Sequence, residues 1–481
     1  MPCFSINSKV KLLLALCIWI YVIYDMYIVN NLTITYMGSL QKQDHKRSDA
    51  VSNNDNNKPS TKEIANSEKP VASVAYHVTL TACQLKFVRL FRDDLSVLKH
   101  SIELNSYPLN PNSKYSAQFY GIVPPHLKDS GCAASLQAEN FTLRILDLPA
   151  TPETIKPPLS QTIARNGCCG HSELMKLHIY TIDPKLHPVS VNLDLDTLVL
   201  KPFDTLFDTI LYPHDTPNGK IARERLISEG YVAPTYIQQH KDNIIQHQTF
   251  DAFYTKDYNM VRQGWQEQRV GMQGGFMMVR PNQTIFDELI QIVKDGNFIM
   301  GRDIGKGWNG SGYGMHIWGA QTIQGLLAYY YNDHWSTSVE LHRCRVNQIA
   351  DNPRRSSADQ RLPRATLLVA NSSLWHDTTC RDGRQNCDDT QCQNWPINET
   401  TMAHFTYCKT PRRCMVTDVS HFEYLNQYAC TDMVREWFRT RQSLERHRKM
   451  SVPVEDESSY FFNTTFGYCN GPQRYVPMKF S

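Results

Sequence analysis

Several features that would place this 481-residue chain in a common functional class are missing from its sequence. The formal net charge is only +3, and no concentrated basic face is present outside the last predicted helix, which argues against a nucleic-acid surface. There is no G-x-x-x-x-G-K-[ST] loop, no G-x-S-x-G elbow and no H-E-x-x-H helix, so neither a Walker site nor the common hydrolase sites are indicated. No internal repeat is evident. What remains is an ordinary globular composition, 41% hydrophobic and 20% charged, in a chain long enough for one large domain or two smaller ones.

The amino terminus carries an apolar run near the lower length limit for crossing a bilayer. Lys9 and Lys11 precede the strictly apolar stretch Leu12–Tyr24, and after Asp25 the apolar character continues through Val29. Because the basic residues come before the run, we expect a cytosolic tail, a retained signal anchor and a lumenal remainder. A cleavable signal peptide is the alternative, since the strictly apolar core is short, but no small-x-small cleavage site follows it.

This topology divides the chain into five expected parts. Residues 31–72 are polar and rich in Asn, Lys, Ser and Asp, so they bury too little apolar surface to fold and are expected to form a disordered stem. The full prediction is a cytosolic tail at 1–11, a transmembrane signal anchor at 12–30, the stem at 31–72, a lumenal globular domain at 73–450 and a C-terminal extension at 451–481. We therefore expect a single-pass type II protein of the Golgi or ER membrane.

Cysteine usage agrees with a lumenal location. Of the 14 cysteines, Cys3 and Cys17 belong to the tail and the span, which leaves an even number for the oxidising side and predicts disulfides. Zinc is the alternative for the dense stretches 380–392 and 408–414, but these lack the C-x-x-C pairs that zinc sites prefer. Glycosylation sequons support the same location and occur at Asn31, Asn140, Asn282, Asn309, Asn371, Asn398 and Asn463.

Apolar periodicity predicts strands that alternate with helices. Strands are expected at 71–80, 116–123, 141–148 and 189–196, and helices at 88–98, 172–180, 285–293, 322–330 and 432–448. This order argues for an α/β fold with a largely parallel sheet. Residues 345–430 are polar, Cys-rich and loop-like, and the Gly-rich segment 305–314 is expected to be a mobile lid or a flexible surface loop.

Two carboxylates end the strand expected at 189–196. Its alternation places Leu195 on the apolar face, and Asp194 and Asp196 together on the polar face. Ligands of open parallel sheets bind at the carboxyl ends of strands, and two acidic oxygens suit Mg²⁺ or Mn²⁺ rather than zinc. An isolated D-x-D is common on surfaces, so the surrounding sequence decides the interpretation.

That surrounding sequence resembles the glycogenin-like (family 8) glycosyltransferases. In this family a Lys-Leu helix precedes a strand ending in D-x-D-T-L-V, and then a D-x-L-F-D segment, an N-S-G-V-x-V-x-x-P strand, a D-Q-G-L-L-N helix and an H-F-x-x-x-K-P block follow. Six blocks match in the family's order, within residues 73–411: Glu173–Ile182, Val191–Leu200, Phe203–Asp208, Gly274–Pro281, Gln324–Tyr330 and His404–Pro411.

The resemblance implies a GT-A-like, Rossmann-type sheet flanked by helices in a glycosyltransferase domain at 73–450. It implies that Asp194, Asp196 and His404 ligate Mn²⁺ (or Mg²⁺) and that Lys409 neutralises the diphosphate of a nucleotide-sugar donor, normally a UDP-hexose. The remaining donor contacts implied by position are Thr79, Leu80, Thr81, Lys176 and Leu195. The family retains the anomeric configuration, and the acceptor implied is a glycan or a protein.

Two departures from the family pattern concern the reacting end of the sugar. The D-Q pair reads Ile323-Gln324, so an acidic group is missing, and the Asn of N-S-G is replaced by Gln273. Gln273, Gln324 and Lys176 are the catalytic candidates, since both amides can still hydrogen-bond a sugar hydroxyl. Asp303 and Asp333 are alternative sources of a carboxylate from another position, and the sequence favours neither.

Two other classes of protein compete with an enzyme. A catalytically inactive lumenal protein that binds a sugar or a nucleotide sugar on the same fold accounts for the missing acid, but not for a complete set of metal and diphosphate ligands. A secreted Cys-rich structural protein accounts for residues 345–481 but not for the six ordered blocks.

Overall fold

The computed structural model describes residues 70–84, 88–167, 169–247, 249–261, 269–303, 305–334, 337–354, 391–408 and 428–448, together with Cys380, Arg384 and Cys387. All of these belong to one of the chain's two compact units, Glu68–Ser481. The expected tail, the anchor at 12–30, nearly all of the stem and the extension at 451–481 lie outside the described residues. Within the described part, no helix combines the length and the apolar character that a membrane span requires.

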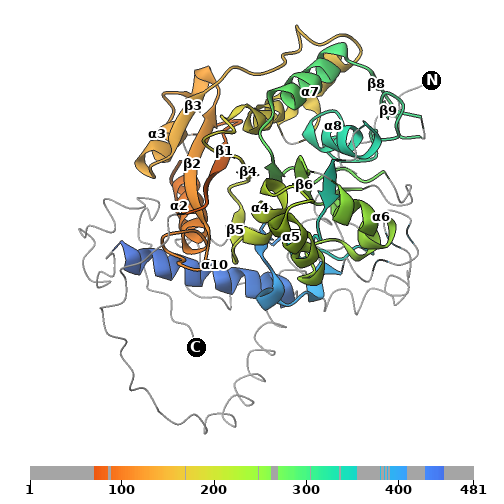
Figure 1. The fold of residues 1–481 in the computed structure, drawn as a ribbon. Helices are drawn as coiled ribbons and strands as arrows, with labels where there is room; N and C mark the ends of the chain where they lie inside the picture. The colour runs from red at the N-terminus through yellow and green to blue at the C-terminus, as the bar shows by residue number, and fades with distance from the viewer. Residues whose placement is uncertain are drawn as a thin grey trace, which may run out of the picture. The chain divides into compact units, whose positions relative to one another are not determined.

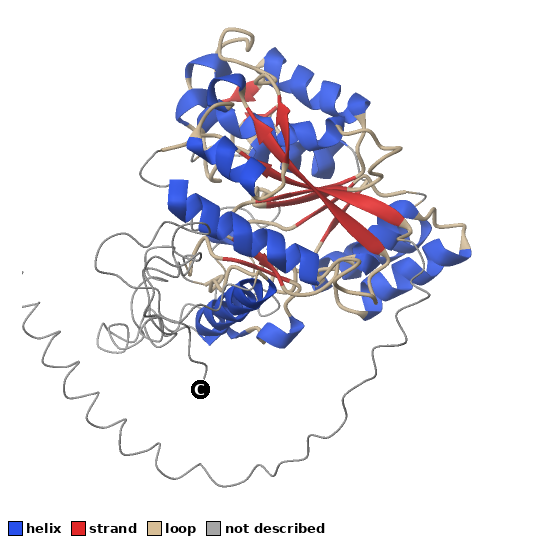
Figure 2. Ribbon diagram, turned by 90° about the vertical axis from the view of Figure 1, so that its left-hand side faces the viewer, coloured by secondary structure: helices blue, strands red, loops and turns tan. Residues whose placement is uncertain are grey.

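A seven-stranded sheet in the order β10-β6-β7-β4-β1-β2-β3 forms the centre of the fold (Figures 1 and 2). Its strands are β1 (Ala72–Thr79), β2 (Tyr115–Val123), β3 (Thr142–Ile145), β4 (Ser190–Leu193), β6 (Ala252–Tyr254), β7 (Phe276–Val279) and β10 (Ser338–Glu340). All neighbouring pairs run parallel except those of β7, which is antiparallel to both β4 and β6. The prediction of an α/β fold with a largely parallel sheet is confirmed.

Helices cover both faces of the sheet, as the view in Figure 2 shows. One apolar core joins β1 and β2 to α2 (Val88–Leu104), α3 (Gly131–Ala138), α4 (Asp204–Leu211) and α5 (Pro217–Ser228), with Leu95 and Leu206 fully buried. A second core joins β6 and β7 to the 3₁₀ helix η6 (Gly170–Thr181), α7 (Gln283–Asp295) and α8 (Ile323–Tyr329). Because both faces are covered, β4 is buried along its whole length and its polar residues Ser190 and Asn192 are as buried as its apolar ones.

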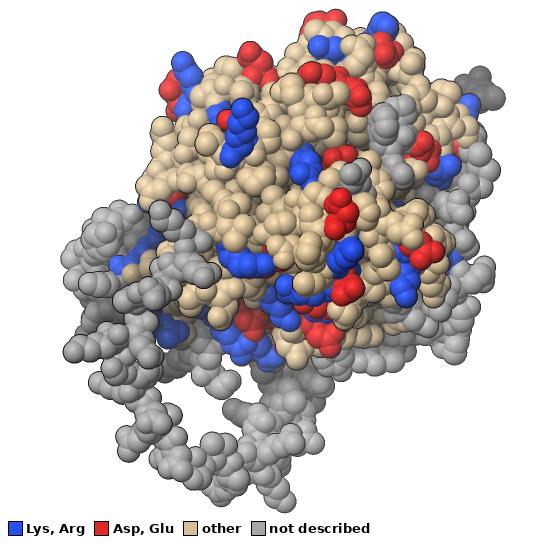
Figure 3. Space-filling model, in the orientation of Figure 1, with Lys and Arg blue, Asp and Glu red and all other residues tan. Residues whose placement is uncertain are grey.

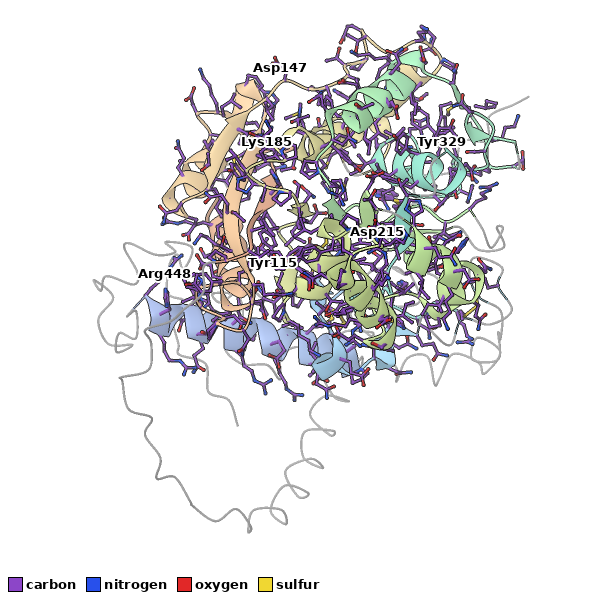
Figure 4. All side chains as sticks on the ribbon, in the orientation of Figure 1. Tyr115, Asp147, Lys185, Asp215, Tyr329 and Arg448 are labelled. Atoms are coloured by element: carbon purple, nitrogen blue, oxygen red, sulfur yellow. A yellow bond between two sulfur atoms is a disulfide. The ribbon has the colours of Figure 1, made fainter. Side chains whose placement is uncertain are left out.

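A third core lies beside the main sheet. The two-stranded sheet of β5 (Thr197–Val199) and β11 (Met402–His404) packs with the long helix α10 (Tyr428–His447) and with α2. Arg441 of α10 forms a buried ion pair with Asp93 of α2, and Arg448 at the helix end (Figure 4) pairs with Glu139. These contacts attach the C-terminal helix to the N-terminal half of the domain.

The remaining elements are short apart from one helix. They are α6 (Pro234–Gln246), β8 (Phe298–Ile299), β9 (Gly307–Trp308), the π-turn Tyr330–His334 and the 3₁₀ turns at 125–127, 159–161, 163–165, 258–260, 392–394 and 397–399. The hairpin β8–β9 corrects the expectation of a lid or flexible loop at 305–314. Trp308 is fully buried and its Nε1 donates to the Ala320 carbonyl at 2.8 Å, which fixes the segment to the domain.

Among the described residues, four disulfides confirm the prediction for the cysteines that they join, and the pairs are Cys83–Cys132, Cys344–Cys392, Cys380–Cys387 and Cys408–Cys430. The zinc alternative is excluded for every cysteine in these pairs, because their thiols are consumed. On the face shown in Figure 3, basic and acidic side chains are interspersed over the described surface, as expected for a net charge of +3.

Candidate metal and nucleotide-sugar site

The two aspartates lie in the turn that follows β4 and not on the strand itself. The predicted strand 189–196 extends three residues too far at its carboxyl end, because β4 ends at Leu193 and β5 begins at Thr197. Backbone bonds fix the turn, with Asp194 N donating to the Gly275 carbonyl at 3.0 Å and Thr197 Oγ1 donating to the Asp194 carbonyl at 2.7 Å. Both carboxylates therefore project at the carboxyl end of β4, but turn geometry and not strand alternation brings them there.

His404 reaches this turn through the small sheet. In the antiparallel pairing of β5 with β11, His404 lies opposite Thr197, and the next residue, Phe405, donates its N–H to the Asp196 carbonyl at 2.7 Å. The imidazole is buried, and its Nε2 lies 3.2 Å from Asp196 Oδ1. One ligand atom from each of Asp194, Asp196 and His404 lies within 4.8 Å of the others, so the structure brings together all three predicted metal ligands.

The donor set fits a hard divalent cation. Two carboxylate oxygens and one imidazole nitrogen are ligands that Mn²⁺ and Mg²⁺ accept, and ligands at right angles around such an ion lie about 3 Å apart. The separation of 3.2 Å between His404 Nε2 and Asp196 Oδ1 agrees with that spacing. Both carboxylates are about one-third exposed, which leaves the outer side open to further oxygen ligands.

Asn347 orients the His404 ring. Its Oδ1 accepts from His404 Nδ1 at 2.9 Å, while its Nδ2 donates to Thr255 Oγ1 at 2.9 Å and to Gln273 Oε1 at 3.2 Å. The proton on Nδ1 is thereby held away from the aspartates, and Nε2 is the nitrogen that faces them. A hydrogen-bond acceptor on the other ring nitrogen fixes the tautomer and orientation of a metal-binding histidine.

The Gly274-Gly275 pair lets the chain pass close behind the triad. A Cβ at Gly275 would lie 2.3 Å from His404 Cε1, whereas the nearest atoms to a Cβ at Gly274 would be Ile323 Cδ1 at 3.3 Å and Gln324 Cγ at 3.5 Å. The space against the imidazole therefore requires glycine at 275.

Lys176, which is predicted to contact the donor, lies beside Asp194. It projects from η6, and its ammonium donates to Asp194 Oδ1 at 2.6 Å and to the Gly274 carbonyl at 2.9 Å. Burial opposes ionisation of Asp196, but the pKa of its carboxyl still lies below the ordinary value because of His404 and Lys176. Burial also works against protonation of His404, yet the Asp196 carboxylate raises the pKa of the imidazole above its ordinary value.

The predicted nucleoside contacts end the neighbouring strand. Thr79 closes β1, and its hydroxyl donates to Asn192 Oδ1 of β4 at 2.9 Å. Leu80 is buried, and Thr81 Oγ1 donates to Cys169 Sγ at 3.5 Å. Because β1 and β4 are parallel neighbours, these three residues and the aspartates lie at the same edge of the sheet.

Gln273 and Gln324 also lie at this edge. Gln273 Oε1 accepts from the Gly275 amide, and Gln324 lies within 3.5 Å of the Cβ position of Gly274. Leu195 packs its side chain onto the first core, so any role of this residue in donor binding belongs to its backbone. Lys409 lies outside the described residues.

A buried carboxylate that the sequence did not single out contacts Gln324. Asp257 Oδ2 accepts from Gln324 Nε2 at 3.0 Å, while Asp257 Oδ1 is buried with no partner among the described residues. Burial raises the pKa of Asp257 to about 6. The two carboxylates considered from the sequence do not occupy such a position, because Asp303 is exposed and Asp333 pairs with Arg269 at 2.6 Å.

Sequence reasoning missed Asp257 and Asn347 for different reasons. Asp257 follows the apolar run 252–254, and a carboxylate just after a strand is a pattern that predicts a site residue. Asn347 follows no such pattern, and its only local feature is a left-handed backbone with φ 70°, a conformation that asparagine tolerates well.

No protein-family model matches this sequence, and no curated protein is similar to it in sequence. Among similar solved structures are the apo form of mouse xyloside xylosyltransferase 1 (12% identity, TM-score 0.35, covering 70% of this chain and 98% of that one) and the bifunctional glycosyltransferase WbbM (12%, 0.33, 78% and 53%). A third is the galactosyltransferase LgtC in complex with donor and acceptor sugar analogues (10%, 0.32, 80% and 98%).

Proposed function

We propose that this chain is a metal-dependent glycosyltransferase of the GT-A type that transfers a hexose from a UDP-hexose to a glycan or protein acceptor with retention of configuration. The observation that carries the proposal is the convergence of Asp194, Asp196 and His404 at the carboxyl edge of the sheet, beside Lys176. The same edge holds the end of β1, where a nucleoside would bind. The six ordered sequence blocks support the same activity.

Each residue has a defined task in this proposal. The triad would hold Mn²⁺ (or Mg²⁺), which when bound neutralises the charge of the donor's diphosphate. The ammonium of Lys176, which contacts Asp194, would stabilise the charge that develops on the leaving group. Gln324, held by Asp257, presents its amide to the reacting end of the sugar.

The proposal extends to location. We propose a type II topology with the anchor at 12–30 and the domain in the lumen of the Golgi or ER. The disulfides support an oxidising compartment, because such bonds persist there and are rare in the cytosol. Protease protection of the large domain in intact microsomes tests the topology, and its digestion would contradict it.

Donor turnover is the direct test of the activity. The full chain in detergent is incubated with Mn²⁺ and a panel of nucleotide sugars, and release of nucleoside diphosphate is followed with and without EDTA. We expect turnover of at least one UDP-hexose that EDTA abolishes. Absence of turnover with every donor, together with sugar binding that EDTA leaves unchanged, would instead support an inactive sugar-binding protein.

A further inference from the structure

The segment Thr255–Tyr258, which follows β6, separates the metal site from a second site. The side chains of this segment divide between the two sites. Asp257 accordingly contacts Gln324 on the side of the metal site. Lys256 and Tyr258 instead contact Glu340 of β10, with Lys256 Nζ 2.8 Å from Oε2 and Tyr258 Oη donating to Oε1 at 3.0 Å.

On that second side lies a cavity of about 700 Å³. It is bounded by α6, the ends of β6 and β10 and the π-turn after α8, and we call it the α6 pocket. Neither the metal triad nor Gln324 lines it. Its volume falls within the range of small-molecule sites.

The floor of the α6 pocket combines aromatic rings with a buried ion pair. Tyr254 and Tyr258 are almost completely buried, and both oxygens of Glu340 are occupied by Lys256 and Tyr258. Lys256 gives one of its three N–H donors to Glu340, and its side chain keeps 18% exposure within the cavity lining. The floor therefore presents N–H donors to a ligand rather than an unpaired charge.

The rim of the α6 pocket is polar and amide-rich. Gln239 and Asn243 of α6 are exposed there, and Asn332 bridges the hydroxyls of Tyr254 (2.7 Å) and Tyr313 (2.9 Å). Amide side chains offer a donor and an acceptor together, which matches the adjacent hydroxyls of a sugar ring.

These features together select one class of ligand. A wholly apolar ligand would strip water from the Lys256–Glu340 pair without replacing its hydrogen bonds. A phosphate is disfavoured because Lys256 and Arg269 are already paired with Glu340 and Asp333, and the third cation of the lining, Arg384, lies over the Tyr258 ring at 4.1 Å. A carbohydrate fits both the aromatic and the polar part of the pocket, because its C–H faces pack on aromatic rings and its hydroxyls form hydrogen bonds with the amides and the ammonium.

We infer that the α6 pocket binds a sugar unit of the acceptor glycan that is remote from the reacting hydroxyl. This inference rests on the proposed function, and the segment Thr255–Tyr258 explains the remoteness, because it stands between the pocket and the triad. The protein would thus recognise an oligosaccharide and not a single sugar.

The test is binding without catalysis. The full chain in detergent is applied, with EDTA and without nucleotide, to an array of immobilised neutral and acidic oligosaccharides, and the best binder is then titrated by calorimetry. Asn243→Trp, an exposed position on α6, should fill the mouth of the pocket and weaken binding at least tenfold. Asn218→Trp, an equally exposed position on α5, is the matched control and should bind as the wild type does.

Two results would overturn the inference: no glycan retained by the wild-type chain, or equal affinity in the two Asn→Trp variants. Donor turnover with Mn²⁺ is measured in parallel on the wild-type chain and on Asn218→Trp, and the two rates should be equal, because Asn218 lines neither the pocket nor the triad. That readout separates failure of the pocket from failure of the proposed function, since a chain that turns over no donor can still bind the glycan.

Discussion

Asp196 and His404 face each other at 3.2 Å, although one lies in the turn after β4 and the other ends β11. Backbone bonds set this relationship, since the Phe405 amide donates to the Asp196 carbonyl and β11 pairs with β5 directly beyond the turn. The ligand side chains are therefore positioned by the fold itself, and removing one of them should leave the others in place.

Loss of either ligand should abolish metal-dependent donor binding. Asp196→Asn removes one anionic oxygen, and His404→Ala removes the nitrogen. We expect the affinity for UDP in the presence of Mn²⁺ to fall more than about 100-fold in each variant. This loss is larger than the loss caused by removing a residue that only orients a metal ligand. Isothermal titration calorimetry measures this directly. Asp215→Asn, at an exposed carboxylate before α5 (Figure 4), is the matched control. Unchanged affinity in both site variants would show that the triad is not the metal site.

The triad was predictable in identity but not in geometry. Asp194 and Asp196 stand out because they follow a buried apolar run, and the block around His404 identifies the third residue of the cluster. Apolar alternation predicts that the aspartates lie on a strand, whereas β4 stops at Leu193. Tertiary pairing of β5 with β11 decides where that strand ends, and periodicity within one segment contains no information about it.

The fold shows the same division between local and long-range information. The long periodic segments gave β1, β2, α7 and α10 nearly at their observed positions. Helices α5 and α6 were not predicted, because neither has a clear apolar face in the sequence. In α6, Ile244 is the one buried side chain. The contact of Asp257 with Gln324 depends on how β6 and α8 meet in space, which no single segment encodes.

A matched pair of glycine variants tests the close approach behind the imidazole. Gly275→Ala places a methyl group 2.3 Å from His404 Cε1, so the ring must move and Mn²⁺ affinity should fall at least tenfold, with a loss of about 1–3 kcal/mol in the free energy of unfolding. The methyl group of Gly274→Ala meets side-chain atoms of Ile323 at 3.3 Å and of Gln324 at 3.5 Å, so this variant should cost less on both measures. Calorimetry and urea denaturation compare the two. Equal effects would mean that His404 is free to shift.

Asn347 should affect metal binding without touching the metal. Asn347→Gly deletes the partner of His404 Nδ1 and keeps the left-handed backbone relaxed, so Mn²⁺ affinity should fall about 10–100-fold. Asn347→Asp retains an oxygen acceptor for Nδ1 and should retain most of the affinity. The readout is metal titration in the absence of nucleotide. A glycine variant that binds Mn²⁺ as tightly as the wild type would remove Asn347 from the site.

Asp257 should make the stability of the domain depend on pH. Burial raises its pKa to about 6 from an ordinary value of 3.8, so between these values the folded chain binds a proton that the unfolded chain has released. Stability from this group is therefore present below about pH 4 and is lost as pH rises through 6. Asp257→Asn keeps an acceptor for Gln324 but carries no charge, so it should stabilise the domain at pH 7.5 by up to about 3 kcal/mol and by much less at pH 4.5.

Urea denaturation in EDTA at the two pH values measures the difference, and EDTA keeps metal binding out of the comparison. Wild type and variant share the titrations of Asp196 and His404, so those contributions cancel in the difference between the two chains. Asp215→Asn, whose carboxylate is exposed, should show the same stability difference from wild type at both pH values. A gain in Asp257→Asn that is equal at pH 4.5 and 7.5 would mean that the carboxylate reaches water or a cation in the folded chain. Asp257 would then not be the dry, hydrogen-bonded support of Gln324 that the proposed mechanism requires.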